Sequence, residues 1–312
     1  MPVLQSPQFQ AMHKIMNITV VGAGTMGNGI AHVFAMNGYK VNLVDINREL
    51  LDKAMATIGQ NLDRMISKGK LDDAGKASTL ANIDRFTSIE DGAKDAHLAI
   101  EAATEDTETK LKIFRELDKV CPAETILASN TSSISITRIA AATKRPDKVI
   151  GMHFMNPVPV MPLVEVIRGY ATTDAVTRAT QEIGKSLGKT PVEVNDYPGF
   201  VSNRILMPMI NEAIYTLFEG VAGVKEIDTV MKLGMNHPMG PLQLADFIGL
   251  DVCLSILKVL REGFGIPKYV PCPLLIHMVD AGHLGVKTGI GFYDYSGATK
   301  EPVVAYKNHK VG

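Results

Sequence analysis

One carboxylate in this chain has surroundings that demand a partner. Glu165 lies within the run Leu163-Val164-Glu165-Val166-Ile167, whose apolar residues indicate a buried strand. An unpaired charge there would cost several kcal/mol or would be removed by protonation. His153 stands upstream of a proline-broken loop that can bring the chain back alongside, and a histidine–carboxylate pair, suited to general acid–base chemistry, accounts for both residues. The alternative is an edge strand on which Glu165 faces water.

A second pattern could hold a phosphate-containing cofactor. Gly22, Gly24 and Gly27 are spaced as G-x-G-x-x-G between an apolar run, Ile18–Val21, and residues of helical periodicity from Met26 onward. Gly22 would allow the tight turn, Gly24 the approach of backbone to a pyrophosphate, and Gly27 the close packing of helix on strand. The phosphates would lie at the helix N-terminus, where free N–H groups point outward.

An acid completes the pattern. The apolar run Val41–Val44 ends in Asp45, where a carboxylate can accept hydrogen bonds from the ribose hydroxyls. Strand, glycine turn, helix, strand and acid follow one another in the expected order, which favours a dinucleotide site over a flexible loop. A 2′-phosphate would face Asp45 as a like charge, so the sequence predicts NAD as the cofactor.

Two polar clusters follow predicted strands. Ser129–Ser133 comes after Ile126–Ala128, and His153–Pro157 comes after Val149–Met152. In open α/β sheets, ligands bind beyond the carboxyl ends of the strands, so both clusters are candidates for a substrate site.

The bulk composition excludes several classes of protein. The chain has 312 residues, 46% of them hydrophobic, which suffices for two domains with real cores. A net charge of −1 gives no general attraction to nucleic acid or to an anionic membrane. Cys121, Cys253 and Cys272 are widely spaced and form no CxxC pair, so we expect reduced thiols in the cytoplasm and no metal site. No apolar segment is long enough to span a bilayer.

The predicted fold is α/β, followed by an all-α part. Residues 17–195 read as a Rossmann-type doubly wound sheet, with an inserted helix pair at 48–68 and 72–80. The insertion ends in basic residues, including Arg64 and Lys68, and from the residues alone a solvated face is favoured there. Residues 1–16 resemble neither a signal nor a transit peptide, and we expect them to be poorly ordered.

The sequence pattern changes from strand-like to helical after a stretch at 195–199 that has the composition of a linker. Residues 196–312 lose the strand pattern and predict an α-helical domain, with helices at 202–219, 224–233, 241–248, 252–262 and 273–280. Many faces of these helices are apolar, so we expect a homodimer formed through this domain. The tail 287–293 reads as an ordered glycine-rich turn of unexplained role.

These motifs together resemble a known family. The chain is similar to the L-3-hydroxyacyl-CoA dehydrogenases, and most of all to the short-chain bacterial enzymes that act on 3-hydroxybutyryl-CoA. The resemblance covers nearly everything from Ile15 to Tyr295. It rests on VGAGTMGNGIA (21–31), EAATED (101–106), SNTSS (129–133), HFMNPVPVMPLVEVI (153–167), DYPGFVSNRI (196–205), NHPMGPLQLADFIGLD (236–251) and KTGIGFYDY (287–295).

The resemblance implies roles for individual residues. His153 would be the general base and Glu165 its orienting partner, while Ser132 and Asn203 would hold the substrate oxygens. The contacts to coenzyme A would come from Lys68 and Asn61. The resemblance therefore favours a binding role for the basic end of the inserted helix pair over a solvated face. The implied cofactor-binding residues are Gly22, Gly24, Thr25, Met26, Gly27, Asp45, Glu105, Lys110, Asn130 and Ser132.

The implied reaction is the NAD-dependent oxidation of (S)-3-hydroxyacyl-CoA to 3-ketoacyl-CoA, or its reverse, without a metal. Met155 stands where the family usually has phenylalanine, and Asn61 occupies a position that is serine in some relatives. Two other functions stay open at this point. One is a hydroxy-acid dehydrogenase of the L-gulonate 3-dehydrogenase type, and the other is an NAD-binding protein without catalytic activity.

Overall fold

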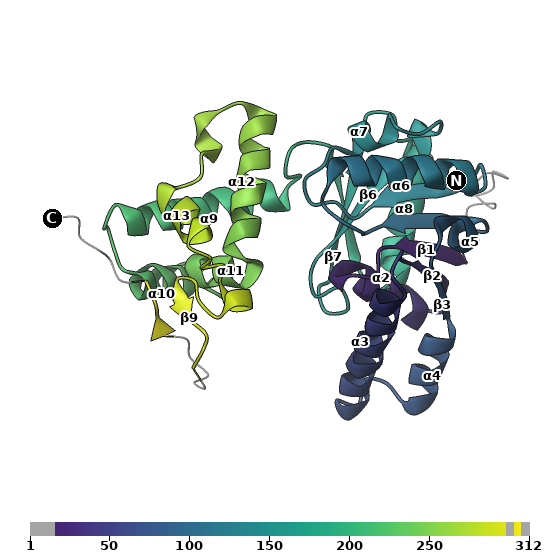
Figure 1. The fold of residues 1–312 in the computed structure, drawn as a ribbon, viewed down its shortest axis with the longest axis horizontal. Coiled ribbons are helices and arrows are strands. Elements are labelled where there is room, and N and C mark those ends of the chain that lie inside the picture. Colours follow the sequence, from purple (N-terminus) through teal and green to yellow (C-terminus); the bar gives the residue numbers. More distant parts are fainter. Residues whose placement is uncertain (1–15, 298–302, 307–312) are drawn as a thin grey trace, which may run out of the picture. The chain divides into compact units, whose positions relative to one another are not determined.

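The structure, a computed structural model, describes residues 16–297 and 303–306. The leader expected to be poorly ordered, residues 1–16, therefore lies outside the described residues apart from Met16. The chain divides into two compact units, residues 1–197 and residues 198–312, which are described separately below (Figure 1).

The first unit is built on an eight-stranded sheet with the order β3-β2-β1-β4-β5-β6-β7-β8. Neighbouring strands are parallel except β6 and β7, which are antiparallel. The chain moves outward from β1 in both directions, so the switch of direction falls between β1 and β4, as the predicted Rossmann-type fold requires. The strands are β1 Asn17–Val21, β2 Lys40–Val44, β3 Ile83–Phe86, β4 Leu98–Glu101, β5 Ile126–Ser129, β6 Val149–Phe154, β7 Leu163–Arg168 and β8 Thr190–Asn195.

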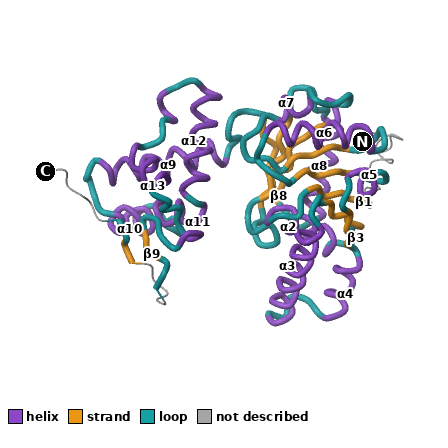
Figure 2. Tube along the Cα trace, viewed as in Figure 1, coloured by secondary structure: helices purple, strands orange, loops and turns teal. Residues whose placement is uncertain are grey.

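Helices cover both sides of this sheet (Figure 2). The larger core contains apolar side chains of β1, β2 and β4 together with those of α2, α3 and α8. The helices are α2 Thr25–Met36, α3 Arg48–Ser67, α4 Asp73–Ala81, α5 Ile89–Ala93, α6 Thr107–Val120, α7 Ile136–Ala140 and α8 Asp174–Ser186. The predicted inserted pair is present as α3 and α4.

Side-chain caps fix where several of these helices begin. Asp72 precedes α4 and accepts a hydrogen bond from the Gly75 N–H, as its position predicts. Asp106 caps α6 by accepting from the Thr109 N–H, so this helix begins before Lys110, where the sequence pattern alone would place its start. The short helices α5 and α7 are not predicted, because five residues are too few to show a helical period.

The second unit is helical, as predicted. Its helices are α9 Ser202–Phe218, α10 Val224–Gly234, α11 Pro241–Ile248, α12 Leu250–Phe264 and α13 Pro273–Asp280. Their apolar faces form one core of their own. A short antiparallel pair, β9 Tyr293–Asp294 and β10 Val303–Val304, was not foreseen from the sequence.

The glycine-rich tail closes a buried network in this unit. Asp246 on α11 is 1% exposed and accepts hydrogen bonds from the N–H groups of Phe292 and Tyr293, both at 3.0 Å. A Cβ atom at Gly291 would lie 1.9 Å from the Asp246 carboxylate, so only glycine allows the tail to come this close. The tail motif therefore has a structural role, which the sequence left unexplained.

A second buried carboxylate joins the same network. Asp228 on α10 accepts a hydrogen bond from the Tyr293 hydroxyl at 2.8 Å. It also accepts hydrogen bonds from the N–H groups of Leu242 and Gln243 at the start of α11. Burial raises the pKa of Asp246 to about 6, although its hydrogen-bond donors oppose the shift. The two carboxylates thus connect α10, α11 and the tail.

Within the described residues, no helix is long and apolar enough to cross a membrane. The same part of the chain holds no cluster of histidine, cysteine or carboxylate side chains arranged to bind a metal ion.

Candidate active site

His153 and Glu165 face each other across the β6–β7 pair. The two residues are register partners in these antiparallel strands, and directly opposed residues project from the same face of a sheet. Both are buried, and His153 Nδ1 lies 2.7 Å from Glu165 Oε2. The sequence correctly predicts that the proline loop returns Glu165 to His153. It wrongly ends the strand before His153, whose ring lies inside β6 and is only 6% exposed at the residue level.

The second ring nitrogen of His153 faces a hydroxyl group. Nε2 lies 3.1 Å from Ser132 Oγ, in the loop that follows β5. Because an ionised carboxylate can only accept, the proton of a neutral ring belongs on Nδ1, toward Glu165. Nε2 is then the basic atom, and it points to the side where Ser132 stands.

Glu105 organises the loop that presents Ser132. Its Oε1 accepts hydrogen bonds from the Thr131 hydroxyl at 2.7 Å, the Ser132 N–H at 2.8 Å and the Ser133 hydroxyl at 2.8 Å. One carboxylate oxygen therefore sets the conformation of three consecutive residues. This is a positioning function that the sequence did not reveal, since the donors come from a turn distant in sequence.

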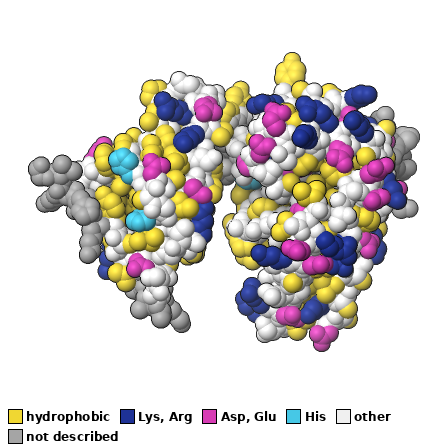
Figure 3. Space-filling view, in the orientation of Figure 1, with side chains coloured by type: hydrophobic (Ala, Val, Ile, Leu, Met, Phe, Trp, Pro, Cys, Tyr) yellow, Lys and Arg dark blue, Asp and Glu magenta, His cyan; other side chains and the backbone are white. Residues whose placement is uncertain are grey.

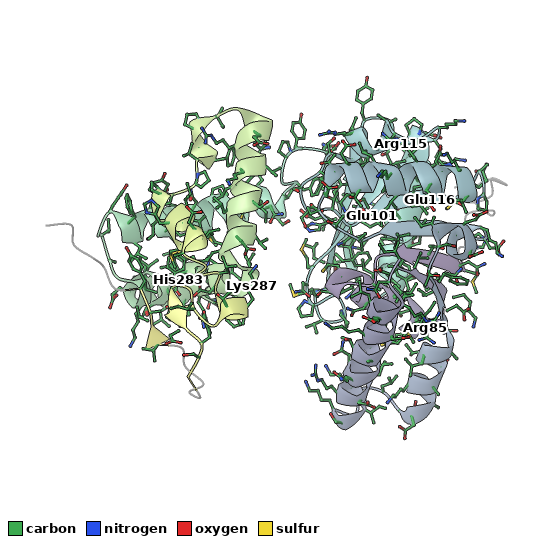
Figure 4. All side chains as sticks on the ribbon, viewed as in Figure 1. Arg85, Glu101, Arg115, Glu116, His283 and Lys287 are labelled. Atoms are coloured by element: carbon green, nitrogen blue, oxygen red, sulfur yellow. The ribbon has the colours of Figure 1, made fainter. Side chains whose placement is uncertain are left out.

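A buried ion cluster lies behind Glu105. The Lys110 ammonium is 2.9 and 2.7 Å from the two carboxylate oxygens of Glu101 and 3.4 Å from Glu105 Oε2. Glu101, at the end of β4, is 0% exposed and also accepts a hydrogen bond from the Ser129 hydroxyl. Figure 4 labels Glu101 among the side chains of the first unit. Lys110 is thus 1% exposed, and its ammonium contacts the carboxylates of both Glu101 and Glu105.

Asn130 connects β5 to the strand that carries His153. Its Oδ1 accepts a hydrogen bond from the Phe154 N–H at 2.9 Å, and its side chain is largely buried. The carbonyl oxygen is used in this contact, so the amide N–H₂ is the part of Asn130 suited to a ligand.

The glycine turn has the form that a dinucleotide requires. Gly22 has φ of 103°, and a Cβ at Gly27 would lie 1.8 Å from the Gly22 carbonyl oxygen, so both positions exclude larger residues. A Cβ at Gly24 would meet nothing within 4 Å. Space therefore opens at the one glycine where a pyrophosphate would approach the backbone, beside Thr25 and Met26 in the first turn of α2.

Asp45 also shapes this turn. Its Oδ2 accepts a hydrogen bond from the Ala23 N–H at 2.8 Å, which ties the end of β2 to the glycine loop. An ionised carboxylate has lone pairs for further donors, so ribose hydroxyls could still bind there. These features fit NAD.

A cavity of about 320 Å³ adjoins the glycine turn. It is lined by Gly24 and Thr25, by α3 residues that include Lys53 and Asn61, and by the segment 156–159 that follows β6. Asn61 therefore lies in a wall of this cavity. Lys68, the C-cap residue of α3, is exposed and does not line it. Figure 3 shows Lys and Arg side chains interspersed with Asp and Glu on the surface of the first unit.

Asn203 belongs to the second unit. It occupies the first turn of α9 and is 8% exposed, and its N–H donates to the Gly199 carbonyl. The other predicted site residues all come from the first unit.

Comparison with known proteins places both units in one family. Residues 17–197 match the model of the 3-hydroxyacyl-CoA dehydrogenase NAD-binding domain, and residues 199–295 match that of the C-terminal domain. The chain is 56% identical to a 3-hydroxybutyryl-CoA dehydrogenase of Bradyrhizobium diazoefficiens, over 92% of this chain and 98% of that protein. A second such enzyme, from Clostridioides difficile, is 53% identical over 90% of this chain and 100% of that protein.

A solved structure is similar over the same length. The crystal structure of (S)-3-hydroxybutyryl-CoA dehydrogenase PaaH1 from Ralstonia eutropha matches with a TM-score of 0.88 and 53% identity, covering 91% of this chain and all of that one. The chain therefore belongs to the 3-hydroxyacyl-CoA dehydrogenase family and is an NAD-dependent oxidoreductase.

Proposed function

We propose that this protein interconverts (S)-3-hydroxyacyl-CoA and 3-ketoacyl-CoA, with the short-chain substrate 3-hydroxybutyryl-CoA preferred. The names of its relatives support this substrate class. The single observation that carries the chemistry is the His153 ring held between Glu165 at 2.7 Å and Ser132 at 3.1 Å.

In the oxidation direction, His153 Nε2 accepts the hydroxyl proton of the substrate. Glu165 orients the ring through Nδ1 and stabilises the imidazolium that forms. NAD, when bound at the glycine turn, supplies the hydride acceptor. Because the reaction removes a proton and a hydride from one alcohol, a single base suffices on the protein.

The substrate oxygens need donors as the ketone develops. Ser132, next to Nε2, would hold the oxygen that loses its proton, and Asn203 would hold the thioester oxygen. Glu105 keeps Ser132 in position by accepting a hydrogen bond from its backbone N–H, and the Lys110 ammonium contacts the carboxylates of both Glu105 and Glu101. Glu105, Lys110 and the Asn130 amide would border the nicotinamide half of the cofactor.

The remaining contacts belong to the two nucleotide portions. Asp45 would bind the adenosine ribose of NAD, with Gly22, Gly24, Thr25, Met26 and Gly27 around the pyrophosphate. For coenzyme A we propose Asn61 in the cavity wall and Lys68 beyond it, where an exposed ammonium can pair with a phosphate at the surface.

We also propose a homodimer formed through the helical domain, residues 196–312, in the cytoplasm. The face of the second unit in Figure 3 carries many apolar side chains. On and beside α9 and α10, the exposed ones include Phe218, Val221, Val230, Leu233 and Met235. So much exposed apolar surface is typical of an interface.

A direct assay tests the proposed reaction. NADH consumption should be fast with acetoacetyl-CoA and slower with longer 3-ketoacyl-CoAs. Turnover of free 3-hydroxy acids in place of the thioesters would favour a gulonate dehydrogenase-like function. A flat NADH trace with every thioester and acid would mean that the protein binds NAD without catalysing this reaction.

A further inference from the structure

The segment Asn156–Pro162 forms part of the cavity wall but has little packing of its own. It leaves β6 just after His153 and returns to β7, which carries Glu165. Residues 156–159 line the cavity beside Gly24 and Thr25. Val158, 2% exposed, is the buried side chain of this segment, and the others are exposed or half-buried. Val158 is therefore the side chain by which this segment is most deeply packed.

The side chain of Val158 packs closely against helix α2. Val158 lies against Gly29 of α2, where an added Cβ would come within 2.9 Å of the valine Cβ. Inside the segment, the N–H groups of Val160 and Met161 both donate to the Pro157 carbonyl, at 2.9 and 3.0 Å. These bonds shape a turn, but they do not attach it to the rest of the first unit.

Lys189 makes that attachment. Its ammonium donates to the Val158 carbonyl at 2.6 Å and to the Met161 carbonyl at 2.7 Å, one at each end of the turn. Lys189 stands between α8 and β8, and its neighbour Thr190 donates its N–H to the Pro162 carbonyl at 2.7 Å. A side chain distant in sequence thus joins both ends of the turn to the rigid sheet.

Lys189 forms no ion pair within the part of the chain that the structure describes. Burial lowers the pKa of its ammonium, and no neighbouring carboxylate opposes that shift. The neighbouring imidazole of His32 is fully buried, and its pKa falls to about 4 because of burial and the Lys189 charge. Both ring nitrogens of His32 lack a hydrogen-bond partner among the described residues. The donors of Lys189 are therefore directed at the segment's carbonyls.

We propose that Lys189 is a positioning residue, which fixes residues 157–162, the segment that follows the strand of His153, so that this wall of the cavity is preformed for the acyl-CoA. This inference rests on the proposed function for its substrate. It concerns a residue that touches neither substrate nor cofactor and acts only through the turn. A loosened wall would weaken binding of the acyl-CoA and the alignment of its reacting carbon.

The test compares Lys189→Met with the matched control Lys185→Met. Lys185, on α8, is exposed and pairs with Glu182 at the surface, so both variants lose one positive charge. We expect Lys189→Met to raise the KM for acetoacetyl-CoA about ten-fold and to speed exchange of the Val160 and Met161 amide hydrogens by a similar factor. Lys189→Arg should recover much of the protection, and Lys185→Met should resemble the wild type in KM and in amide exchange.

Amide exchange makes this test independent of the assigned reaction. If the wild-type protein did not reduce any 3-ketoacyl-CoA, the proposed function would fail, while the exchange of Val160 and Met161 would still report on Lys189. Unchanged exchange in Lys189→Met, or equal changes in Lys189→Met and Lys185→Met, would overturn the proposal. If Lys189→Met failed to fold, Lys189→Gln would replace it, because its amide keeps a donor and a smaller change is then expected in the same direction.

Discussion

Each buried carboxylate of the first unit is held by specific donors. Glu165 faces the His153 ring, and Glu101 accepts from the Lys110 ammonium, the Ser129 hydroxyl and a backbone N–H. Removing Lys110 alone would leave Glu101 uncompensated at a cost of about 3–5 kcal/mol. These side chains are therefore fixed in place by their hydrogen-bond partners.

Gly24 allows the sharpest prediction for a single residue of the cofactor site. Gly24→Ala should leave the free protein stable, because its Cβ would meet nothing within 4 Å. It should raise the Kd for NADH by about ten-fold or more, since the methyl group would occupy space that a pyrophosphate needs. Fluorescence titration and thermal unfolding measure the two quantities.

Gly59→Ala is the matched control for Gly24→Ala. Gly59 also has open space around an added Cβ but lies within α3, away from the glycine turn. Its NADH affinity should equal that of the wild type. If Gly24→Ala bound NADH as tightly as Gly59→Ala does, the glycine turn would not be the pyrophosphate site.

At the residue scale, sequence reasoning found Glu165 but missed Glu101. Both carboxylates lie in apolar runs that predict buried strands, so the same test would have singled out Glu101. Its partner could not be named from the sequence, because Lys110 reaches back from α6 across a turn. Glu105 was expected at the cofactor, whereas its three hydrogen bonds to residues 131–133 depend on tertiary structure.

At the scale of elements, long helices and strands follow from periodicity and short ones do not. The α-helices in the described part of the second unit were predicted with nearly their observed bounds, because their apolar residues recur at helical spacing. The antiparallel direction of β6 and β7 follows from the short proline loop between them. The β9–β10 pair could not be predicted, since two residues per strand carry no alternation.

The buried network of α10, α11 and the tail predicts a specific pH dependence. Folding raises the pKa of Asp246 from 3.8 to about 6, so in this range the folded protein holds a proton that the unfolded chain has released. The contribution of Asp246 to stability therefore increases as the pH falls through about 6 and levels off below the unfolded value, by at most about 3 kcal/mol.

Urea unfolding of wild type and Asp246→Asn at pH 7 and pH 5 measures this effect. The stability advantage of the wild type over Asp246→Asn should be larger at pH 5, because asparagine does not titrate. Asp280→Asn, at an exposed position ending α13, provides the comparison for a carboxylate outside the network. If the stability difference between wild type and Asp246→Asn were smaller at pH 5, the surroundings of Asp246 would stabilise its ionised form, and the prediction would be wrong.

At the scale of the whole molecule, the exposed apolar side chains of the second unit predict a homodimer. Light scattering at micromolar concentration should give twice the mass of the 33.8 kDa chain. Leu233→Asp should reduce that mass to the monomer, since Leu233 is 82% exposed and a buried charge would oppose association. Tyr170→Asp, at a position of the first unit that is 95% exposed, should leave the dimer intact.

A monomeric mass for the wild type would refute the dimer. A dimeric mass for Leu233→Asp would instead place the interface elsewhere on the chain. Neither result would bear on the NAD site, whose glycine turn and Asp45 lie within the first unit.

We propose His153, oriented by Glu165, as the base of the reaction. His153→Gln should lower kcat by about 10²–10⁴, the range for a positioned proton acceptor, and should keep NADH binding. The most direct test is the pH–rate profile for hydroxyacyl-CoA oxidation by wild type and Glu165→Gln. We predict a lower kcat for Glu165→Gln and an acidic limb that moves to lower pH, because the imidazolium loses its counter-charge. Coincident profiles with equal kcat would contradict the pairing of base and carboxylate.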